Sequence, residues 1–462
     1  MKILLAASEV VPFAKTGGLA DVAGALPMAL EELKQEVIVV MPQYRELKGK
    51  TQTKIGKNIK VYFIKNDQYF DRPGLYGEKT GDYPDNLDRF SFFCKKAMEL
   101  AKKINFKPDI IHCHDWQSAL IPVYLKSIYK NDKFFKNTRT LLTIHNIGYQ
   151  GIFPKEQFLK VGLDWSYFTM DTLEFYDKIN ILKGGMAFAD AINTVSPTYS
   201  KEIMTPEQGF GLEGMLQKRK EMVFGIINGL DYSAWDPAKD KFLAKTYSPQ
   251  TVENKRINKE ALQKDCKLPV KSEVPLFGFV GRLAAQKGID ILEEAIEKID
   301  QMDIQMVILG TGEEKYHTLL QNIAKRYPKQ VCLFLKFDNT LAHRIYAGSD
   351  VFLMPSRYEP CGLGQMISFK YATAVIANQT GGLCDTVADF DFRKQKGNGF
   401  IFDRYCRDAL TTAMLRAALA FQDKKGWQNL LSRCMEMNFS WQESAKKYID
   451  LYNLLLGKKK KQ

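Results

Sequence analysis

The chain lacks the uninterrupted run of about 18 apolar residues that a membrane span requires, although 45% of its 462 residues are hydrophobic. The apolar stretch after Lys2 resembles the start of a secretion signal, but Glu9 and Lys15 interrupt the apolar character soon after it. This stretch is therefore expected to form a buried strand. We expect no membrane span and a cytoplasmic protein.

Cysteine is also scarce, with eight residues and no C-x-x-C spacing. Cys113 lies between His112 and His114, which raises the possibility of a metal site. An apolar run that ends in His114-Asp115 is, however, more typical of a strand that leaves the core. The sequence predicts reduced, structural thiols and no bound metal.

Motifs for nucleic-acid binding are missing too, despite a net charge of +13 and a pI near 9.1. The lysines are spread along the chain, and the only dense run is Lys458–Lys461. The positive charge could equally attract a phosphorylated small molecule. No nucleic-acid partner is expected, and no role is assigned to the basic tail.

Short apolar runs separated by amphipathic stretches occur in two series. The first comprises residues 3–6, 37–40, 110–111, 141–144 and 191–195; the second comprises residues 276–280, 306–309, 331–334, 351–354 and 374–377. Continuously apolar strands with helices between them predict a parallel sheet covered on both faces. The sequence therefore predicts an α/β protein with two Rossmann-like, doubly wound domains. The expected domains are residues 1–240 and 241–440, followed by a C-terminal helix and tail over 441–462.

Ligands of open α/β sheets bind beyond the carboxyl ends of the strands, and glycines and cations gather there in both halves. In the first half, Lys15 precedes a Gly17-Gly18 turn and a helical pattern, a possible anion site or simply a turn. This turn is neither a G-x-G-x-x-G nor a Walker A motif, which disfavours a dinucleotide or ATP-motor site there. A second turn, Gly381-Gly382, occupies the corresponding place in the second half.

Side chains suited to a sugar diphosphate follow other strands. Arg282 and Lys287 flank a strand-to-helix turn, and a guanidinium with an ammonium suits diphosphate oxygens. Lys287 could be a solvated surface residue, whereas Arg282, directly after a buried strand, fits that interpretation poorly. Glu359 could accept hydrogen bonds from sugar hydroxyls. His145 could face a ligand or be a structural histidine.

Taken together, these motifs resemble bacterial glycogen synthase and plant starch synthase. The matching segments run in order from residue 1 to about residue 387: Lys15–Val22, His114–Trp116, His145–Gly151, Asn228–Asp231, Gly281–Leu283, Gln286–Gly288 and Ser356–Leu363. The resemblance implies a retaining glycosyltransferase of GT-B architecture, with a cleft between its domains. It implies transfer of glucose from ADP-glucose to the non-reducing end of an α-1,4-glucan, with release of ADP and no cofactor.

The resemblance also implies roles for individual residues. Arg282 and Lys287 would hold the diphosphate, Glu359 would bind glucose hydroxyls, and His145 and Asp115 would lie by the transferred glucose. The remaining substrate-binding residues implied are Lys15, Gly17, Gly18, Phe337, Cys361, Gly362, Leu363, Thr380, Gly381 and Gly382. Among these, Phe337 would lie near the adenine, and the Gly381-Gly382 turn would offer backbone N–H groups to phosphate. The family's C-terminal helix returns to the first domain, as residues 441–456 could here.

Three positions depart from patterns common in related enzymes. Ile367 stands where related transferases often have a second glutamate, Ala372 replaces a glycine, and Asn378 stands where arginine is frequent. Only the last could weaken donor binding or shift nucleotide choice. A related transferase that uses UDP-glucose or another acceptor, and a non-catalytic glucan-binding protein, remain alternatives.

Overall fold

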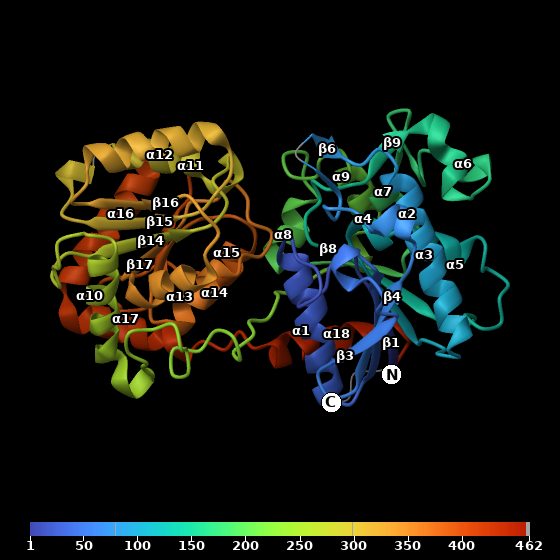
Figure 1. The fold of residues 1–462 in the computed structure, drawn as a ribbon, viewed down its shortest axis with the longest axis horizontal. Coiled ribbons are helices and arrows are strands. Elements are labelled where there is room, and N and C mark those ends of the chain that lie inside the picture. The colour runs from blue at the N-terminus through green and yellow to red at the C-terminus, as the bar shows by residue number, and fades with distance from the viewer. Residues whose placement is uncertain (79, 298, 459–462) are drawn as a thin grey trace. The chain divides into compact units, whose positions relative to one another are not determined.

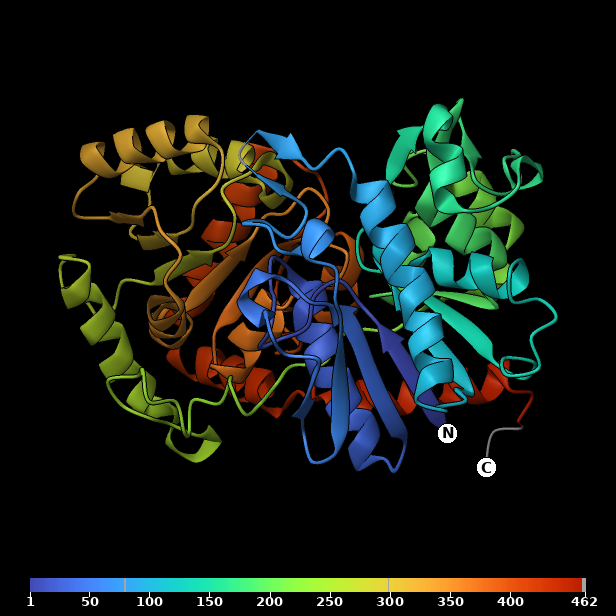
Figure 2. The same cartoon turned by 45° about the vertical axis from the view of Figure 1, so that its right-hand side comes forward.

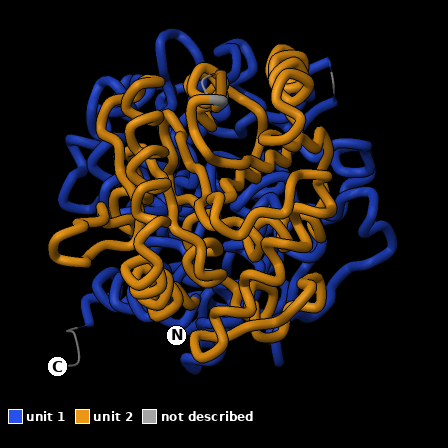
Figure 3. Tube along the Cα trace, turned by 90° about the vertical axis from the view of Figure 1, so that its left-hand side faces the viewer, with its two compact units in different colours: residues 1–229, 441–462 blue, residues 230–440 orange. Residues whose placement is uncertain are grey.

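The computed structural model describes residues 1–78, 80–297 and 299–458, which fall into two units (Figure 3). Unit 1 comprises Met1–Gly229 and Trp441–Gln462, and unit 2 comprises Leu230–Ser440. Of the basic run at the C-terminus, only Lys458 is among the described residues. Among those residues, no helix is both long and apolar enough to cross a membrane.

Unit 1 is built on an eight-stranded sheet in the order β13-β12-β8-β7-β1-β2-β4-β3. Its strands are β1 (Lys2–Ala6), β2 (Glu36–Pro42), β3 (Gln52–Ile55), β4 (Ile59–Ile64), β7 (Ile110–His114), β8 (Arg139–Ile144), β12 (Ala191–Thr194) and β13 (Val223–Gly225). All neighbouring pairs are parallel except β3 and β4. The three residues between β3 and β4 are too few for a crossover, so this edge strand runs antiparallel.

Unit 2 contains a wholly parallel sheet in the order β16-β15-β14-β17-β18-β19. Its strands are β14 (Leu276–Val280), β15 (Gln305–Leu309), β16 (Val331–Phe334), β17 (Val351–Met354), β18 (Ala374–Asn378) and β19 (Gly399–Phe402). Every strand expected from an apolar run is present, but β3, β4, β13 and β19 were not expected. The central strands are buried along nearly their whole length, as a sheet covered on both faces requires.

Helices connect the strands in both units. Those of unit 1 are α1 (Gly18–Glu32), α2 (Asp67–Phe70), α3 (Asn86–Lys103), α4 (Asp115–Ser118), α5 (Leu120–Lys126), α6 (Phe158–Val161), α7 (Ile181–Phe188), α8 (Pro197–Glu202), α9 (Glu213–Lys218) and α18 (Trp441–Leu455). Those of unit 2 are α10 (Lys255–Asp265), α11 (Ile289–Ile296), α12 (Glu314–Arg326), α13 (Asn339–Gly348), α14 (Gly364–Lys370), α15 (Gly381–Thr386), α16 (Arg407–Gln422) and α17 (Lys424–Glu436). Small sheets pair β5 (Gly77–Glu78) with β6 (Gly81–Asp82), and β11 (Lys178–Asn180) with β9 (Ile152–Pro154) and β10 (Glu174–Phe175).

The last helix, α18, packs beside α1 and is held in unit 1 by buried polar contacts (Figures 1 and 2). The Tyr452 hydroxyl lies 2.8 Å from Nδ1 of His112, and Asn193 donates to the Tyr448 hydroxyl over 3.2 Å. A Cβ on Gly229 would lie 2.5 Å from the Cα of Trp441, so only glycine allows this close approach of the backbone. The end of the chain thus forms part of the core of unit 1.

Tyr452→Phe is expected to lower the free energy of unfolding by about 1–3 kcal/mol, because it leaves a buried imidazole nitrogen without its partner. The urea midpoint by circular dichroism measures this effect. Leu454→Ala on the same helix serves as a control, since Leu454 is exposed and its truncation should change stability by less than about 0.5 kcal/mol. Equal midpoints for Tyr452→Phe and the parent protein would contradict a stabilising contact.

Candidate active site

Each unit carries a cluster of polar side chains at the carboxyl ends of its parallel strands, where ligands of such sheets bind. In unit 1, Asp115 follows β7 and His145 follows β8. In unit 2, Arg282 follows β14 and Glu359 comes shortly after β17. The predicted catalytic residues are therefore divided between the two sheets, and each cluster is described by itself.

Asp115 braces the turn that carries His145. It adopts a left-handed backbone conformation with φ of 55°, which is strained for a residue other than glycine. Its Oδ1 accepts a hydrogen bond of 2.7 Å from the backbone N–H of His145. Burial raises the pKa of Asp115 to about 7. One oxygen of this carboxyl group thus positions the loop, in addition to any contact with a sugar.

His145 is paired with a second histidine. Its Nε2 lies 2.9 Å from Nδ1 of His114, and the two rings are stacked. One of these nitrogens must donate and the other accept, so the contact couples the tautomers of the two rings. Burial lowers the pKa of His145 to about 3, and His145 is therefore neutral at pH 7.

A third histidine continues this row into the core. The His112 ring centroid lies 4.2 Å from that of His114, and its Nε2 lies 2.7 Å from the Thr143 hydroxyl. Because its Nδ1 contacts Tyr452, a chain of polar contacts and stacked rings joins α18 to His145. Cys113, which lies between His112 and His114 in the sequence, is buried in β7, and this confirms the strand predicted there. Among the described residues, no group of three His, Cys, Asp or Glu side chains is arranged to hold a metal ion.

The Gly17-Gly18 turn surrounds a carboxylate of the protein itself. Glu9 accepts hydrogen bonds from the backbone N–H groups of Thr16 and Gly17, the latter over 3.3 Å, and from the Thr16 hydroxyl over 2.6 Å. The Gly17 amide, expected near the substrate, is therefore engaged internally in this structure. Lys15 is exposed and forms a 2.7 Å ion pair with Asp21. Sequence reasoning missed Glu9; the available signal was a carboxylate within an otherwise apolar, buried segment.

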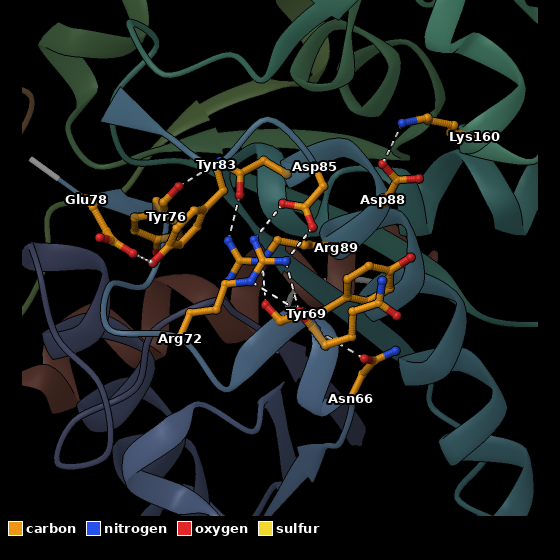
Figure 4. Close-up of polar contacts among 12 residues, drawn as sticks. Asn66, Tyr69, Arg72, Tyr76, Glu78, Tyr83, Asp85, Asp88, Arg89 and Lys160 are labelled. Carbon is orange, nitrogen blue, oxygen red and sulfur yellow. Dashed lines mark hydrogen bonds and ion pairs between the residues drawn. The ribbon is translucent and has the colours of Figure 1, made fainter. Parts of the chain in front are cut away.

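The segment that follows β4 supplies a further hydrogen-bond donor to Glu9. Tyr76 donates its hydroxyl hydrogen to the Glu9 carboxylate over 2.6 Å. Figure 4 shows how this segment is held, with two guanidinium nitrogens of Arg72 on the Asp85 carboxylate at 2.7 and 2.6 Å. Arg89, nearby and buried, donates to backbone carbonyls of the same segment. The position of the Lys15–Gly18 loop therefore depends on contacts that local sequence patterns do not reveal.

In unit 2, Lys287 and Glu359 form an ion pair. The Lys287 Nζ lies 2.5 Å from the Glu359 carboxylate, which also accepts a 2.9 Å hydrogen bond from the Ser356 hydroxyl. The Glu359 side chain is buried and that of Lys287 is half-buried. Lys287, which was predicted to bind phosphate, and Glu359, which was predicted to bind sugar hydroxyls, therefore lie in direct contact.

Arg282 differs from its expected environment. It is exposed, and its guanidinium donates to the Gln286 side chain over 3.0 Å. The expectation that Lys287, rather than Arg282, would be the more solvated of the two was wrong. The chain leaves the sheet at Gly281, so the next side chain already faces solvent.

The two glycines of the Gly381-Gly382 turn in unit 2 pack directly against neighbouring backbone. A Cβ on Gly381 would lie 2.0 Å from the Glu359 carbonyl oxygen, and one on Gly382 would lie 2.1 Å from that of Cys361. The Gly382 N–H donates to the Glu359 carbonyl over 3.0 Å. The Gly381-Gly382 turn is therefore required for this packing, and it fixes the loop that carries Glu359.

The remaining predicted residues lie in loop segments of unit 2. Gly362 has a φ of 76°, Leu363 precedes α14, and Thr380 is buried ahead of α15. Phe337 is 89% exposed, as an aromatic ring open to a ligand would be. Asn378 donates its side-chain amide to the Ser356 carbonyl over 2.9 Å. This contact gives the unusual asparagine a physical role, because Ser356 in turn donates to Glu359.

The buried carboxyl group of Asp115 should make the free energy of unfolding depend on pH. Its pKa is raised to about 7 from the usual 3.8, so its contribution to stability is present below pH 4 and is lost as the pH rises through 7. The free energy of unfolding of the parent protein, relative to Asp115→Asn, should therefore fall by about 1.4 kcal/mol per pH unit within that window. Urea titrations of both proteins at pH 5 and 7.5 measure the difference. Parallel pH dependences would contradict the raised pKa.

Comparison with known proteins places these two clusters in context. Residues 2–218 match a family model described as the starch synthase catalytic domain, and residues 262–422 match one described as glycosyl transferases group 1. The chain is 48% identical to a glycogen synthase of Geotalea daltonii, covering 99% of this chain and 100% of the relative. It is 42% identical to a glycogen synthase of Thermotoga maritima, with 99% of each chain covered.

Solved structures agree with these sequence relationships. The catalytic domain of starch synthase IV from Arabidopsis thaliana, described as bound to ADP and acarbose, has a TM-score of 0.89 at 33% identity, with 99% of each chain covered. A sucrose-phosphate synthase from Thermosynechococcus elongatus, with a TM-score of 0.66 at 18% identity, shares the fold. The predicted α/β class with two Rossmann-like units in GT-B architecture is confirmed. The chain belongs to the glycogen and starch synthase family of glycosyltransferases.

Proposed function

We propose that the protein transfers glucose from ADP-glucose to the non-reducing end of an α-1,4-glucan, with retention of configuration and release of ADP. The glycogen synthase relatives and the starch synthase structure described with ADP support this donor and acceptor. The observation that carries the proposal is the Lys287–Glu359 ion pair at the strand ends of unit 2. It supplies one group for a phosphate and one for sugar hydroxyls at the same place.

The cations of unit 2 act on the leaving diphosphate. The exposed guanidinium of Arg282 can form paired hydrogen bonds with phosphate oxygens. Lys287 transfers its ammonium contact from Glu359 to the β-phosphate, where negative charge grows as the glycosidic bond breaks. Glu359, released from that contact, accepts hydrogen bonds from glucose hydroxyls. These two cations supply the positive charge that a divalent metal supplies in other nucleotide-dependent enzymes.

The residues of unit 1 act near the transferred glucose and the acceptor. His145 is neutral, so it can bind a sugar hydroxyl without adding positive charge beside an oxocarbenium-like sugar. Asp115 holds the His145 loop in place. Lys15, with the Gly17-Gly18 turn, contacts the donor's distal phosphate and sugar. In this proposal unit 1 serves the acceptor and adds the Lys15 contact to the donor, and unit 2 holds the rest of the donor.

The chemistry takes place on one face of the sugar. Departure of the diphosphate and attack by the acceptor hydroxyl occur on the same side, and the leaving phosphate oxygen takes the acceptor's proton. Retention then needs no second carboxylate of the kind that retaining glycosidases use.

The other predicted contacts belong to the same proposal. Phe337 stacks on the adenine, which its exposure permits. The loops with Cys361, Gly362 and Leu363, and with Thr380, Gly381 and Gly382, shape the site around the phosphates and glucose. The cytoplasmic location, the absence of a nucleic-acid partner and the binding of the donor in an interdomain cleft stay predictions.

A donor with a different base is the main alternative, since phosphate and sugar contacts would be similar for UDP-glucose. Initial rates with ADP-glucose and with UDP-glucose, using glycogen as acceptor, separate the two. Faster turnover with ADP-glucose, with released ADP and lengthened chains, is the expected result. A strong preference for UDP-glucose would overturn the donor assignment.

Lys287→Ala should lower kcat/KM for ADP-glucose by more than about tenfold, or about 1.4 kcal/mol of transition-state stabilisation. The physical reason is the loss of a cation from the leaving group. Lys329→Ala is the matched control, because Lys329 is an exposed lysine of the same unit and outside the site. Unchanged kinetics in a folded Lys287→Ala protein would remove Lys287 from the proposed clamp.

A further inference from the structure

Unit 1 exposes three aromatic rings on loops that meet just beyond His145. Tyr176 is 78% exposed, Tyr149 56% and Phe210 47%. Tyr149 belongs to the same loop as His145, whereas Phe210 and Tyr176 come from segments far along the chain. Gathered exposed apolar groups of this kind mark binding surfaces in soluble proteins. We refer to Tyr149, Phe210 and Tyr176 as the aromatic strip.

Contacts between the loops show that the three segments that carry the strip are neighbours. A Cβ on Gly148 would lie 3.9 Å from the Phe210 ring, and the Gln150 side chain donates to the Phe210 carbonyl over 3.1 Å. On the other side, a Cβ on Gly211 would lie 3.7 Å from the Tyr176 ring. The loop of Tyr149 therefore touches Phe210, and the loop of Phe210 touches Tyr176.

The backbone beneath two of these rings is strained. Tyr176 and Asp177 form the two-residue turn between β10 and β11, with φ of 50° and 61°. Such turns favour asparagine, aspartate or glycine, which tolerate positive φ. Phe210 likewise has a φ of 52°. Large rings at left-handed positions cost stability, and such strain clusters at functional sites.

The chemistry of the strip fits a neutral polymer of sugars. The C–H faces of glucose rings are apolar and can lie flat on aromatic rings, while their hydroxyls stay in water. Tyrosine suits this surface because it combines an apolar ring with a polar end. The flanking charges Lys155 and Asp177 are paired with each other at 2.7 Å, so this pair adds no net charge beside the strip.

The area of the strip argues against a protein partner. Complete coverage of the three rings at these exposures would bury at most about 450 Å². Each partner in a stable protein pair buries about 800 Å². A chain of sugar rings needs no larger surface than the strip offers.

We propose that the aromatic strip binds the α-1,4-glucan chain beyond the glucose unit that reacts at His145. This inference rests on the proposed function, and it adds the acceptor path and residues that favour long acceptors. The strip starts in the His145 loop and leads outward through Phe210 to Tyr176. An acceptor whose end lies at His145 can therefore contact the strip with its following sugars, whereas a short acceptor cannot reach all of it.

The experiment compares acceptors of different length. Tyr176→Asn and Phe210→Asn remove a ring and keep a residue that tolerates positive φ. The KM for maltoheptaose should rise at least fivefold in each variant, while the KM for maltotriose and for ADP-glucose should change less than twofold. Leu419→Asn is the matched control, because Leu419 is 68% exposed on α16 of unit 2. Its KM values should equal those of the parent protein.

Hydrogen exchange of the parent protein with maltoheptaose gives a readout that needs no variant. Slower exchange is expected in residues 148–151, 174–177 and 208–212. Unchanged exchange there, or equal KM values for maltoheptaose in all the proteins, would overturn the inference while leaving the proposed function intact. A dimer of the parent protein that Tyr176→Asn dissociates would identify the strip as a subunit contact instead. A parent protein inactive with ADP-glucose would refute the proposed function itself, and the inference with it.

Discussion

The ion pair between Lys287 and Glu359 is the contact on which the account of unit 2 depends. A half-buried ammonium and a buried carboxylate lie 2.5 Å apart, and neither could be held there alone without a large desolvation cost. The Ser356 hydroxyl also donates to this carboxylate, and Asn378 in turn donates to the Ser356 carbonyl. In the proposed reaction, a diphosphate takes over the ammonium and glucose hydroxyls take over the carboxylate, so that one satisfied arrangement replaces another. The charges are therefore in place before the reaction begins, which is where enzymes gain most of their electrostatic advantage.

In unit 1, too, polar groups at the strand ends are held by partners within the protein, here including backbone N–H groups. The N–H groups of Thr16 and Gly17 bind Glu9, so a protein carboxylate occupies the turn that was expected to receive substrate. Tyr76 holds Glu9 from the opposite side, and the Arg72–Asp85 contacts hold the segment of Tyr76. His145 is likewise fixed by neighbours, through Asp115 and His114. His145 in unit 1 and Glu359 in unit 2 are thus each oriented by a partner distant in the sequence.

The sequence was informative about the strands and about which residues follow them. Apolar runs predicted the central strands because those are buried on both faces, and the residues after them, such as Asp115 and His145, lie at the expected sheet edges. The short edge strands β3, β13 and β19 carry weaker apolar signals and were missed, together with β4. Exposure was harder to predict, and Arg282 and Lys287 were ranked in the wrong order. Contacts such as Glu9 with Gly17, or Tyr452 with His112, join distant segments and leave no local pattern.

In the proposed mechanism, Lys287 exchanges its carboxylate partner for the leaving phosphate. A crystal structure of the protein with ADP tests it most directly, through the position of the Lys287 Nζ. This atom is expected about 3 Å from a β-phosphate oxygen, with Arg282 on the same diphosphate. A diphosphate bound elsewhere, with Lys287 still on Glu359, would contradict it.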